Sequence, residues 1–327
     1  MSNRQFKPKK STYQLVTDMR DSRGITFKYT NEVKAAHYLS NVNNYLRTAA
    51  FRNNYEKYQK GKNQGKYIDL DFLCLQELST IDMHYRFLVD KMCSDIEHAM
   101  RVKLIKDIEV DSTTDGYDIV YNYLTYNPSE IKRIENTISS PHTGELIRKY
   151  FTVNQQVNAN AQTKNIITAY NDCPAWVLVE ILSFGSLASF YEYYYKSRKM
   201  PYISMSIINM VRSLRNAAAH NNCILYDLKP KTSVVQGGLN NYIKSKAPRI
   251  TKSQRSKRFK SRPLLEFVAM VYMYDKLVFG KVRDHRVDEI RELFEVRMIE
   301  KKELLKRNEL LKASYLFAIQ VLKSTLF

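Results

Sequence analysis

Three residues near the middle of the chain carry side chains that together could cleave RNA. Arg215, Asn216 and His220 lie within the run RNAAAH. An imidazole can take up and release a proton near neutral pH, which attack by a 2′-hydroxyl and departure of a 5′-oxygen both require. An arginine fork can hold two phosphate oxygens, and an asparagine can hydrogen-bond a phosphate or orient the imidazole. These residue types predict strand cleavage by the RNA's own 2′-hydroxyl, with no metal ion required.

A predicted helix over residues 204–226 places these side chains on one face. Wound at about 100° per residue, the helix has an apolar stripe facing the core, made of Ile203, Ile207, Met210, Val211, Leu214, Ala217 and Ala218. The opposite face is a polar shelf, which we define as Arg212, Arg215, Asn216, Ala219 and His220. Ile208 is an apolar residue on that polar side. A solvated surface helix with a satisfied histidine is the alternative interpretation, since an Arg-x-x-x-x-His spacing also arises by chance.

The run RNAAAH resembles the Arg-x-x-x-x-His signature of HEPN-domain ribonucleases, in its Arg-Asn-x-x-Ala-His form. Residues 173–194 resemble the Pro-x-Trp-x-x-x-Glu…Phe-Gly segment of bacterial abortive-infection (Abi) proteins of the Abi-D/Abi-F kind, and residues 39–51 resemble that family's Asn-Tyr-Tyr-Arg element. With the helix that carries Asp82, Arg86, Glu97 and Arg101, these patches span residues 24–227. Asn221 and Cys223 depart from the pattern, because many members have His and Arg there.

The resemblance implies an all-α fold, metal-independent endoribonuclease activity and an active site composed of two such motifs. No other histidine of this chain has an arginine five residues before it, so a site of two motifs implies a homodimer. In the resemblance the helix with Glu97 packs on the motif helix, and Glu97 could orient Arg215 or His220 as a second-shell carboxylate. An ordinary i,i+4 salt bridge to Arg101 is the first explanation for Glu97.

The charge of the chain indicates a polyanionic partner. The 327 residues carry 52 Lys and Arg against 33 Asp and Glu, a formal net charge of +19, which is typical of proteins that bind nucleic acid or an anionic membrane surface. Residues 228–265 hold eleven Lys and Arg and no acid, and the apolar residues there are scattered, which disfavours a helix lying in a membrane. This segment follows the motif helix directly, so we expect it near the polar shelf.

We predict that the basic segment binds RNA phosphates, with a solvated charge run as the alternative. Tyr242 and Phe259 could stack on bases. The predicted RNA-binding residues are Arg212, Lys244, Lys246, Arg249, Lys252, Arg255, Lys257, Arg258, Lys260 and Arg262.

Other features of the chain indicate a cytoplasmic protein without a cofactor, and the family resemblance implies a bacterial one. Its basic N-terminus has no apolar run behind it. Residues 176–188 are the most apolar stretch, but Glu180 and Gly185 interrupt them and they are too short for a membrane span, so we expect a buried helix. The four cysteines lie far apart, with no metal-ligand spacing. We therefore expect reduced thiols, no metal and no membrane partner.

The predicted organisation is all-α, a HEPN-like helical bundle with N- and C-terminal helical extensions. Helical patterns occur over residues 31–58, 69–107, 263–280 and 288–326, and Pro128 is placed to begin another helix. We predict a basic N-terminal arm over residues 1–66, a HEPN-like core over 67–227, a basic loop or insertion over 228–263, and C-terminal helices over 264–327.

The sequence thus predicts a dimeric, metal-independent endoribonuclease of an abortive-infection or toxin–antitoxin system. His220 would move protons, Arg215 would bind the scissile phosphate, Asn216 would position one of them, and Arg212 would extend the phosphate contact. The first alternative is a non-catalytic RNA-binding HEPN protein that holds a structured small non-coding RNA, which could also restrain the nuclease. The second is a DNA-binding or scaffold protein in phage defence.

Overall fold

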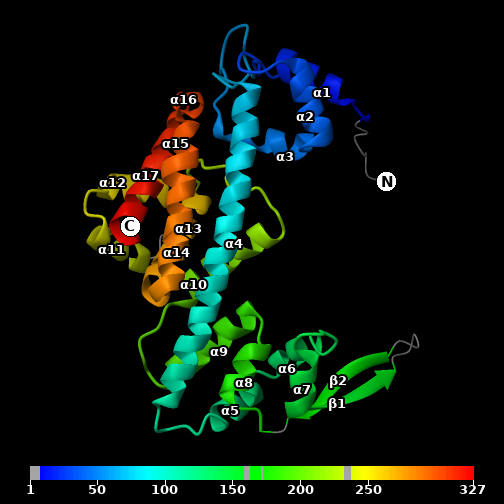
Figure 1. Cartoon of the computed structure of the whole chain (residues 1–327), viewed down its shortest axis with the longest axis vertical. Coiled ribbons are helices and arrows are strands. Elements are labelled where there is room, and N and C mark those ends of the chain that lie inside the picture. Colours follow the sequence, from blue (N-terminus) through cyan, green and yellow to red (C-terminus); the bar gives the residue numbers. More distant parts are fainter. Residues whose placement is uncertain (1–7, 158–162, 171, 232–236) are drawn as a thin grey trace. The chain divides into compact units, whose positions relative to one another are not determined.

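The chain folds mainly into helices, and the predicted all-α class is confirmed. A computed structural model describes residues 8–157, 163–170, 172–231 and 237–327 (Figure 1). The chain forms two compact units. Unit 1 comprises residues 1–93, 213–275 and 279–327, and unit 2 comprises residues 94–212 and 276–278. The predicted four-part division at residues 66, 227 and 263 was based on charge and composition, and it stays a prediction.

The longest helix, α4 (Phe72–Glu109), confirms the long helix predicted over residues 69–107. Asp71 stands just before it and fixes its start. One carboxylate oxygen of Asp71 accepts from the Leu73 amide at 3.0 Å, while the other accepts from the Thr26 hydroxyl and the Lys28 amide at 2.8 and 2.7 Å. Helix initiation and docking of the N-terminal segment therefore depend on the same carboxylate.

The N-terminal part of unit 1 is a set of short helices rather than the single stretch predicted over residues 31–58. Asn31 and Asn44 each accept a hydrogen bond from the amide three residues later, and each such cap starts a new helix. The elements are α1 (Thr12–Asp21), α2 (Glu32–Asn41), α3 (Tyr45–Ala50) and η1 (Phe51–Asn54).

The C-terminal part of unit 1 contains helices where a basic loop was predicted. Gly237–Lys246 forms α11 and Lys252–Arg258 forms α12, the latter started by a capping box between Thr251 and Gln254. The buried helix predicted from residue 263 is α13 (Arg262–Leu277). The elements that follow are α14 (Gly280–Arg291), the π-helical η2 (Glu292–Arg297), α15 (Met298–Glu300), α16 (Lys302–Leu305) and α17 (Glu309–Thr325).

Unit 2 contains a β-hairpin that the helical patterns did not predict. Strands β1 (Phe151–Val157) and β2 (Thr163–Tyr170) are antiparallel, and the register runs from Phe151 opposite Tyr170 to Val157 opposite Thr163, with an irregularity at Thr152 (Figure 1). The helices of this unit are α5 (Asp118–Tyr126), α6 (Pro128–Glu135), α7 (Gly144–Tyr150), α8 (Ala175–Ile181) and α9 (Phe184–Ser197). Pro128 is the first residue of α6, as predicted.

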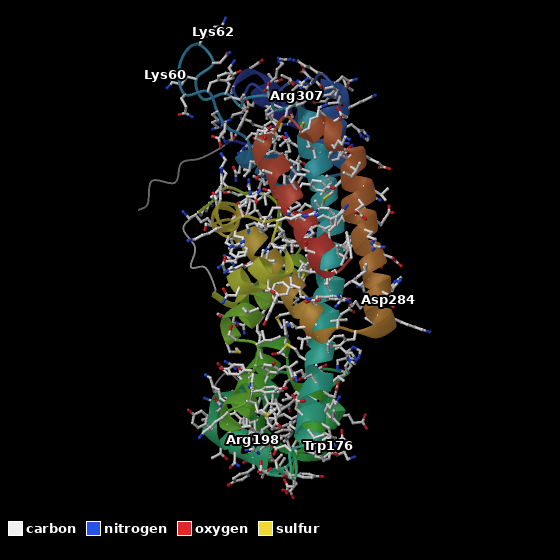
Figure 2. The ribbon with its side chains drawn as sticks, turned by 90° about the vertical axis from the view of Figure 1, so that its left-hand side faces the viewer. Lys60, Lys62, Trp176, Arg198, Asp284 and Arg307 are labelled. Carbon is white, nitrogen blue, oxygen red and sulfur yellow. The ribbon has the colours of Figure 1, made fainter. Side chains whose placement is uncertain are left out.

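The apolar stretch 176–188 is divided between α8 and α9, with Ser183 as the cap that starts α9. Most of the stretch is buried, as expected, but it forms parts of two helices rather than one, and Trp176 lies at the surface with 47% of its area exposed (Figure 2). Within the described ranges, no helix is both long and apolar enough to cross a membrane.

The C-terminal end of α9 is fastened to the end of α4 through Asp111. Its carboxylate accepts from the Arg198 guanidinium at 2.6 Å and from the hydroxyls of Tyr194 and Thr113 at 3.3 and 2.6 Å (Figure 2). These bonds, those of Thr113 first and then those of Arg198, hold the pKa of the Asp111 carboxyl well below its ordinary value.

Candidate active site and nucleic-acid interface

The motif helix is α10 (Met205–Ala219), and it presents the predicted apolar stripe to the core. Ile207, Val211 and Leu214 are buried, as expected. Ile208 is also fully buried, although the helical angle placed it on the polar side. The helix is therefore packed on two sides near its start. Asn209 is exposed, and the C-terminal end of the helix, with Asn216 and Ala219, is open to solvent.

His220 lies at this open end, just beyond the last turn of α10. Asn221 has a positive φ of 58°, the left-handed conformation that asparagine tolerates better than most residues. Its amide donates to the Ala218 carbonyl at 2.9 Å, and the Asn222 amide donates to the Ala217 carbonyl at 2.8 Å. These two bonds form a Schellman motif in which His220 is the C-cap residue. The cap fixes the path of the backbone before and after His220.

The polar shelf is exposed in its C-terminal half. Asn216, Ala219 and His220 are exposed, whereas Arg212 and Arg215 are half-buried. The Arg215 guanidinium donates to the Asn216 side-chain oxygen at 3.3 Å. Arg215, Asn216 and His220 belong to unit 1 and share one stretch of helix. The imidazole is thus open to solvent, as a proton-transfer group requires.

Arg212 is the last residue of the first segment of unit 2, and a glycine makes room for it. A Cβ at Gly185 would lie 2.8 Å from an Arg212 guanidinium nitrogen. Gly185 belongs to the Phe-Gly pair of residues 184–185, so the absence of a side chain there allows the guanidinium to lie against α9.

The Arg47 side chain, from α3, forms two hydrogen bonds with Asn221, the residue after His220. One guanidinium nitrogen donates to the Asn221 main-chain carbonyl at 2.5 Å, and the other donates to the Asn221 side-chain oxygen at 3.3 Å. A guanidinium has five donors in a fixed fork, and such paired bonds orient what they hold. Arg47 therefore positions the backbone beside the imidazole from 174 residues away in sequence.

Asp82 of α4 holds the segment that leaves the motif. One oxygen of its fully buried carboxylate accepts from the amides of Ile224 and Leu225 at 2.8 and 2.7 Å, and the other pairs with Arg86. Burial raises the pKa of Asp82, while the two backbone donors and Arg86 oppose that shift.

Asn54, also buried, completes this anchorage. Its side-chain nitrogen donates to the Leu225 carbonyl at 2.9 Å, and its side-chain oxygen accepts from the Leu228 amide at 2.8 Å. Residues 221–228, which we call the exit segment, are thus held by Arg47, Asp82 and Asn54. None of these three was predicted as a site residue. Arg47 and Asp82 lie in the patches that carry the family resemblance, and this was the only signal available.

Glu97 forms the helix salt bridge expected of it. Its carboxylate accepts from Arg101 at 2.8 Å, and Arg101 also donates to the carbonyls of Val179 and Leu182 at 2.9 and 3.1 Å. Arg101 thereby fastens α4 to the break between α8 and α9. A role for Glu97 in orienting Arg215 or His220 stays a prediction.

Cys223 is the thiol nearest the motif in sequence. It is half-buried, and burial raises its pKa, so it is a protonated thiol at neutral pH. In the described parts of the chain, no group of three or more His, Cys, Asp or Glu side chains could hold a metal ion.

The excess of positive over negative charge lies in one of the two units. Unit 2 carries 13 Lys and Arg and 13 Asp and Glu, whereas unit 1 carries 39 and 20. The whole formal net charge of +19 therefore lies in unit 1, with Arg215, His220 and the basic segment.

The basic segment contacts the motif helix at one end. Arg262 donates to the Ser213 hydroxyl at 2.7 Å and pairs with Glu266 at 2.8 Å. Ser213 lies on α10 beside the polar shelf, two turns before His220. The Lys231 amide donates to the Lys260 carbonyl at 2.6 Å, so the two ends of the segment meet.

Most of the predicted RNA-binding residues are exposed. The exposed side chains are those of Lys244, Lys246, Arg249, Lys252, Lys257, Lys260 and Arg262. Lys246 lies 3.5 Å from Asp275, and Arg258 is half-buried. These side chains come from α11, α12 and their flanking turns, so the basic segment is an ordered surface over residues 237–262.

Three predictions for this segment were wrong because the residues are buried. Arg255 is 7% exposed, and its guanidinium donates to the Ile250 carbonyl at 2.5 Å and to the Asn240 side chain at 3.1 Å. The hydroxyl of buried Tyr242 donates to Asp275, and Phe259 packs edge-on against Phe317. Arg255 therefore braces α11 against α12, and neither aromatic ring can stack on a base.

The model of one protein family, described as Abi-like protein, matches residues 37–226, which is more than half of the chain. The matched range includes Arg47, Asp82 and the run from Arg215 to His220. No curated protein and no solved structure matches the chain.

Proposed function

This chain belongs to the Abi-like protein family, and we propose that it acts in abortive infection against phage as a metal-independent endoribonuclease of the HEPN type in the bacterial cytoplasm. The observation that carries the proposal is the pair of half-buried Arg215 and exposed His220 at the end of α10, on the positively charged unit. Three long-range anchors hold the exit segment directly behind this pair. Such precise support is expected of a group that must meet a reacting atom.

The reaction is a transesterification within the RNA. His220 takes the proton of the 2′-hydroxyl as its oxygen attacks the adjacent phosphorus, and the bond from phosphorus to the 5′-oxygen breaks. A second imidazole gives a proton to the departing 5′-oxygen. Arg215 stabilises the charge that develops on the phosphate oxygens, and Asn216 orients the phosphate or the imidazole. The products carry a 2′,3′-cyclic phosphate and a 5′-hydroxyl.

The second imidazole comes from a second copy of the chain in this proposal. The sequence contains one Arg-x-x-x-x-His motif, so two polar shelves facing each other across a two-fold axis would form the composite site. Light scattering at concentrations where the protein cleaves RNA tests this step. An active monomer contradicts the composite site.

The exposed lysines and arginines of residues 237–262 provide the RNA-binding surface of this proposal. Contacts to phosphates from such side chains fix the register of a strand without reading its sequence. Arg262 links this surface to α10, and Arg212 extends the phosphate contact along the helix.

The test is cleavage of a labelled RNA in the presence of EDTA, with analysis of the product ends. His220→Ala and Arg215→Ala should each lower the cleavage rate by about a hundredfold or more. His142→Ala, an exposed histidine in a turn, is the matched control and should leave the rate unchanged. Products with 3′-hydroxyl and 5′-phosphate ends and a magnesium requirement would refute the mechanism.

The same variants separate the alternative of a non-catalytic HEPN protein that holds a structured small non-coding RNA. In that case RNA binds, no cleavage occurs, and nucleic acid that copurifies with the protein is a single defined species. A restrained nuclease would also yield such a species, but its removal would release cleavage that depends on His220.

A further inference from the structure

Unit 1 contains an apolar cavity of about 160 Å³ whose wall includes the exit segment. Its lining comes from α4, the exit segment, α13, η2 and α17, with Ile81, Leu225, Phe267, Phe294, Leu311 and Ala318 as representative residues. Two polar groups in the wall are bonded to protein: the Ser314 hydroxyl donates to the Leu310 carbonyl at 2.7 Å, and the Tyr315 hydroxyl donates to the Phe294 carbonyl at 3.0 Å. The apolar walls of such a cavity favour an apolar group over water.

The size and the rim of the cavity define what it can take. An apolar cavity of about 150 Å³ holds a benzene molecule. Lys302, Lys306 and Lys312 also line this cavity, and all three are exposed, so they stand at its opening. Lys306 and Lys312 pair with Glu303 and Glu309 of the same helical turns. Exposed pairs of this kind contribute little and are readily exchanged for another anion.

A π-helical segment forms part of the wall. Phe294 belongs to η2, a wider helical turn of a kind that is frequent at functional sites. The same residue contributes its ring to the cavity and its carbonyl to the bond with Tyr315. The irregular turn thus places the aromatic ring against the cavity.

We propose that this cavity binds a small amphipathic organic anion, with an apolar group the size of a benzene ring inside and a carboxylate beside Lys302, Lys306 and Lys312. The apolar group would contact Leu225 and Leu228, whose amides are held by Asp82 and Asn54. Leu225 is five residues from His220, and both flank the anchored start of the exit segment. A ligand in the cavity therefore changes how the exit segment holds the imidazole of His220. This second step, control of RNA cleavage by the ligand, rests on the proposed function.

Isothermal titration calorimetry of the full chain with phenylbutyrate tests the binding step. Phenylbutylamine is the matched probe with the same apolar body and the opposite charge, and acetate is the probe without an apolar body. We expect phenylbutyrate to bind at least tenfold more tightly than the amine and acetate not to bind. Equal affinity for the amine, or no binding of phenylbutyrate, overturns the proposal.

Variants locate the site. Ala318→Phe fills the cavity and should abolish binding, whereas Leu316→Phe adds the same ring at an exposed position of α17 and should leave binding unchanged. The double variant Lys306→Gln and Lys312→Gln preserves the core and should remove the preference for the anion, while Lys323→Gln on the same helix should retain it. Binding that survives both Ala318→Phe and the double variant places the ligand elsewhere and refutes the site.

The cleavage assay tests the second step separately. Phenylbutyrate should change the cleavage rate at least threefold in the unaltered chain and have no effect in Ala318→Phe. Binding without a rate change retains the ligand site and refutes the coupling. A chain that binds phenylbutyrate but never cleaves RNA refutes the proposed function and leaves the ligand site intact.

Discussion

Replacing Asp82 by asparagine would test whether one buried carboxylate secures the exit segment. The Asp82→Asn side chain would keep an oxygen that can accept from the amides of Ile224 and Leu225, but it would turn an amide group toward Arg86. Alanine at the same position would remove all three interactions. The two variants therefore separate the ion pair from the backbone bonds.

The expected magnitudes follow from the burial of the pair. The side chains of Asp82 and Arg86 are 0% and 7% exposed. Removing one partner of a buried ion pair costs about 3–5 kcal/mol, because the other charge is left without compensation. Each buried amide without an acceptor costs about 1–3 kcal/mol. We expect Asp82→Asn to lower the free energy of unfolding of unit 1 by about 3 kcal/mol, and Asp82→Ala by about 2 kcal/mol more.

Urea unfolding followed by circular dichroism measures these losses, and hydrogen exchange of residues 221–228 measures local opening of the exit segment. Combining Asp82→Asn with Arg86→Met should recover most of the loss, since a hydrophobic side chain of similar volume removes the unpaired charge. Glu303→Ala, which removes the exposed partner of Lys306, is the control and should have no measurable effect.

Two results would refute the reasoning about Asp82. One is a loss for Asp82→Asn that is no larger than that of the exposed control. The other is a double variant as unstable as Asp82→Asn, because the uncompensated Arg86 charge would then not be the source of the loss. Unchanged hydrogen exchange in residues 221–228 would further contradict the anchoring of the exit segment.

Three further predictions concern other parts of the chain. Asn221→Ala should destabilise unit 1 by about 1 kcal/mol more than Asn221→Gly in the same urea assay. Both variants lose the side-chain amide of Asn221, but only alanine is strained at the positive φ of this position. Equal losses of stability would contradict the cap. Thr113 and Arg198 depress the pKa of Asp111 in the folded chain. The stabilising contribution of Asp111 is therefore present above the unfolded pKa of about 4 and is lost as the pH falls below it. The thermal unfolding midpoints of the unaltered chain and Asp111→Asn should differ above about pH 4 and converge as the pH falls below that value. The double variant Lys252→Gln and Lys257→Gln should reduce the magnitude of the negative slope of log affinity for single-stranded RNA against log salt by about 1.4, whereas Lys196→Gln in the neutral unit 2 should leave the slope unchanged.

Local pattern was enough to predict several elements of this protein. The extent of α4, the start of α6 at Pro128 and the apolar stripe of α10 depend on helical periodicity and on capping residues that act within one turn. The concentration of positive charge in one segment is likewise a property of the sequence. The hairpin of β1 and β2 was not predicted, because most residues of its strands are exposed or half-buried and leave little regular apolar alternation in the sequence.

Only the tertiary structure decided which faces of these elements meet. Ile208 is buried despite its polar-side angle, and Arg255 is buried despite its basic neighbours, because a second element packs against each of them. The bonds from Arg47 and Asp82 to the exit segment join residues more than 140 positions apart. Periodicity describes one helix at a time, so the sequence by itself determined which residues could do chemistry, and the packing of distant segments decided which of them are exposed and how His220 is supported.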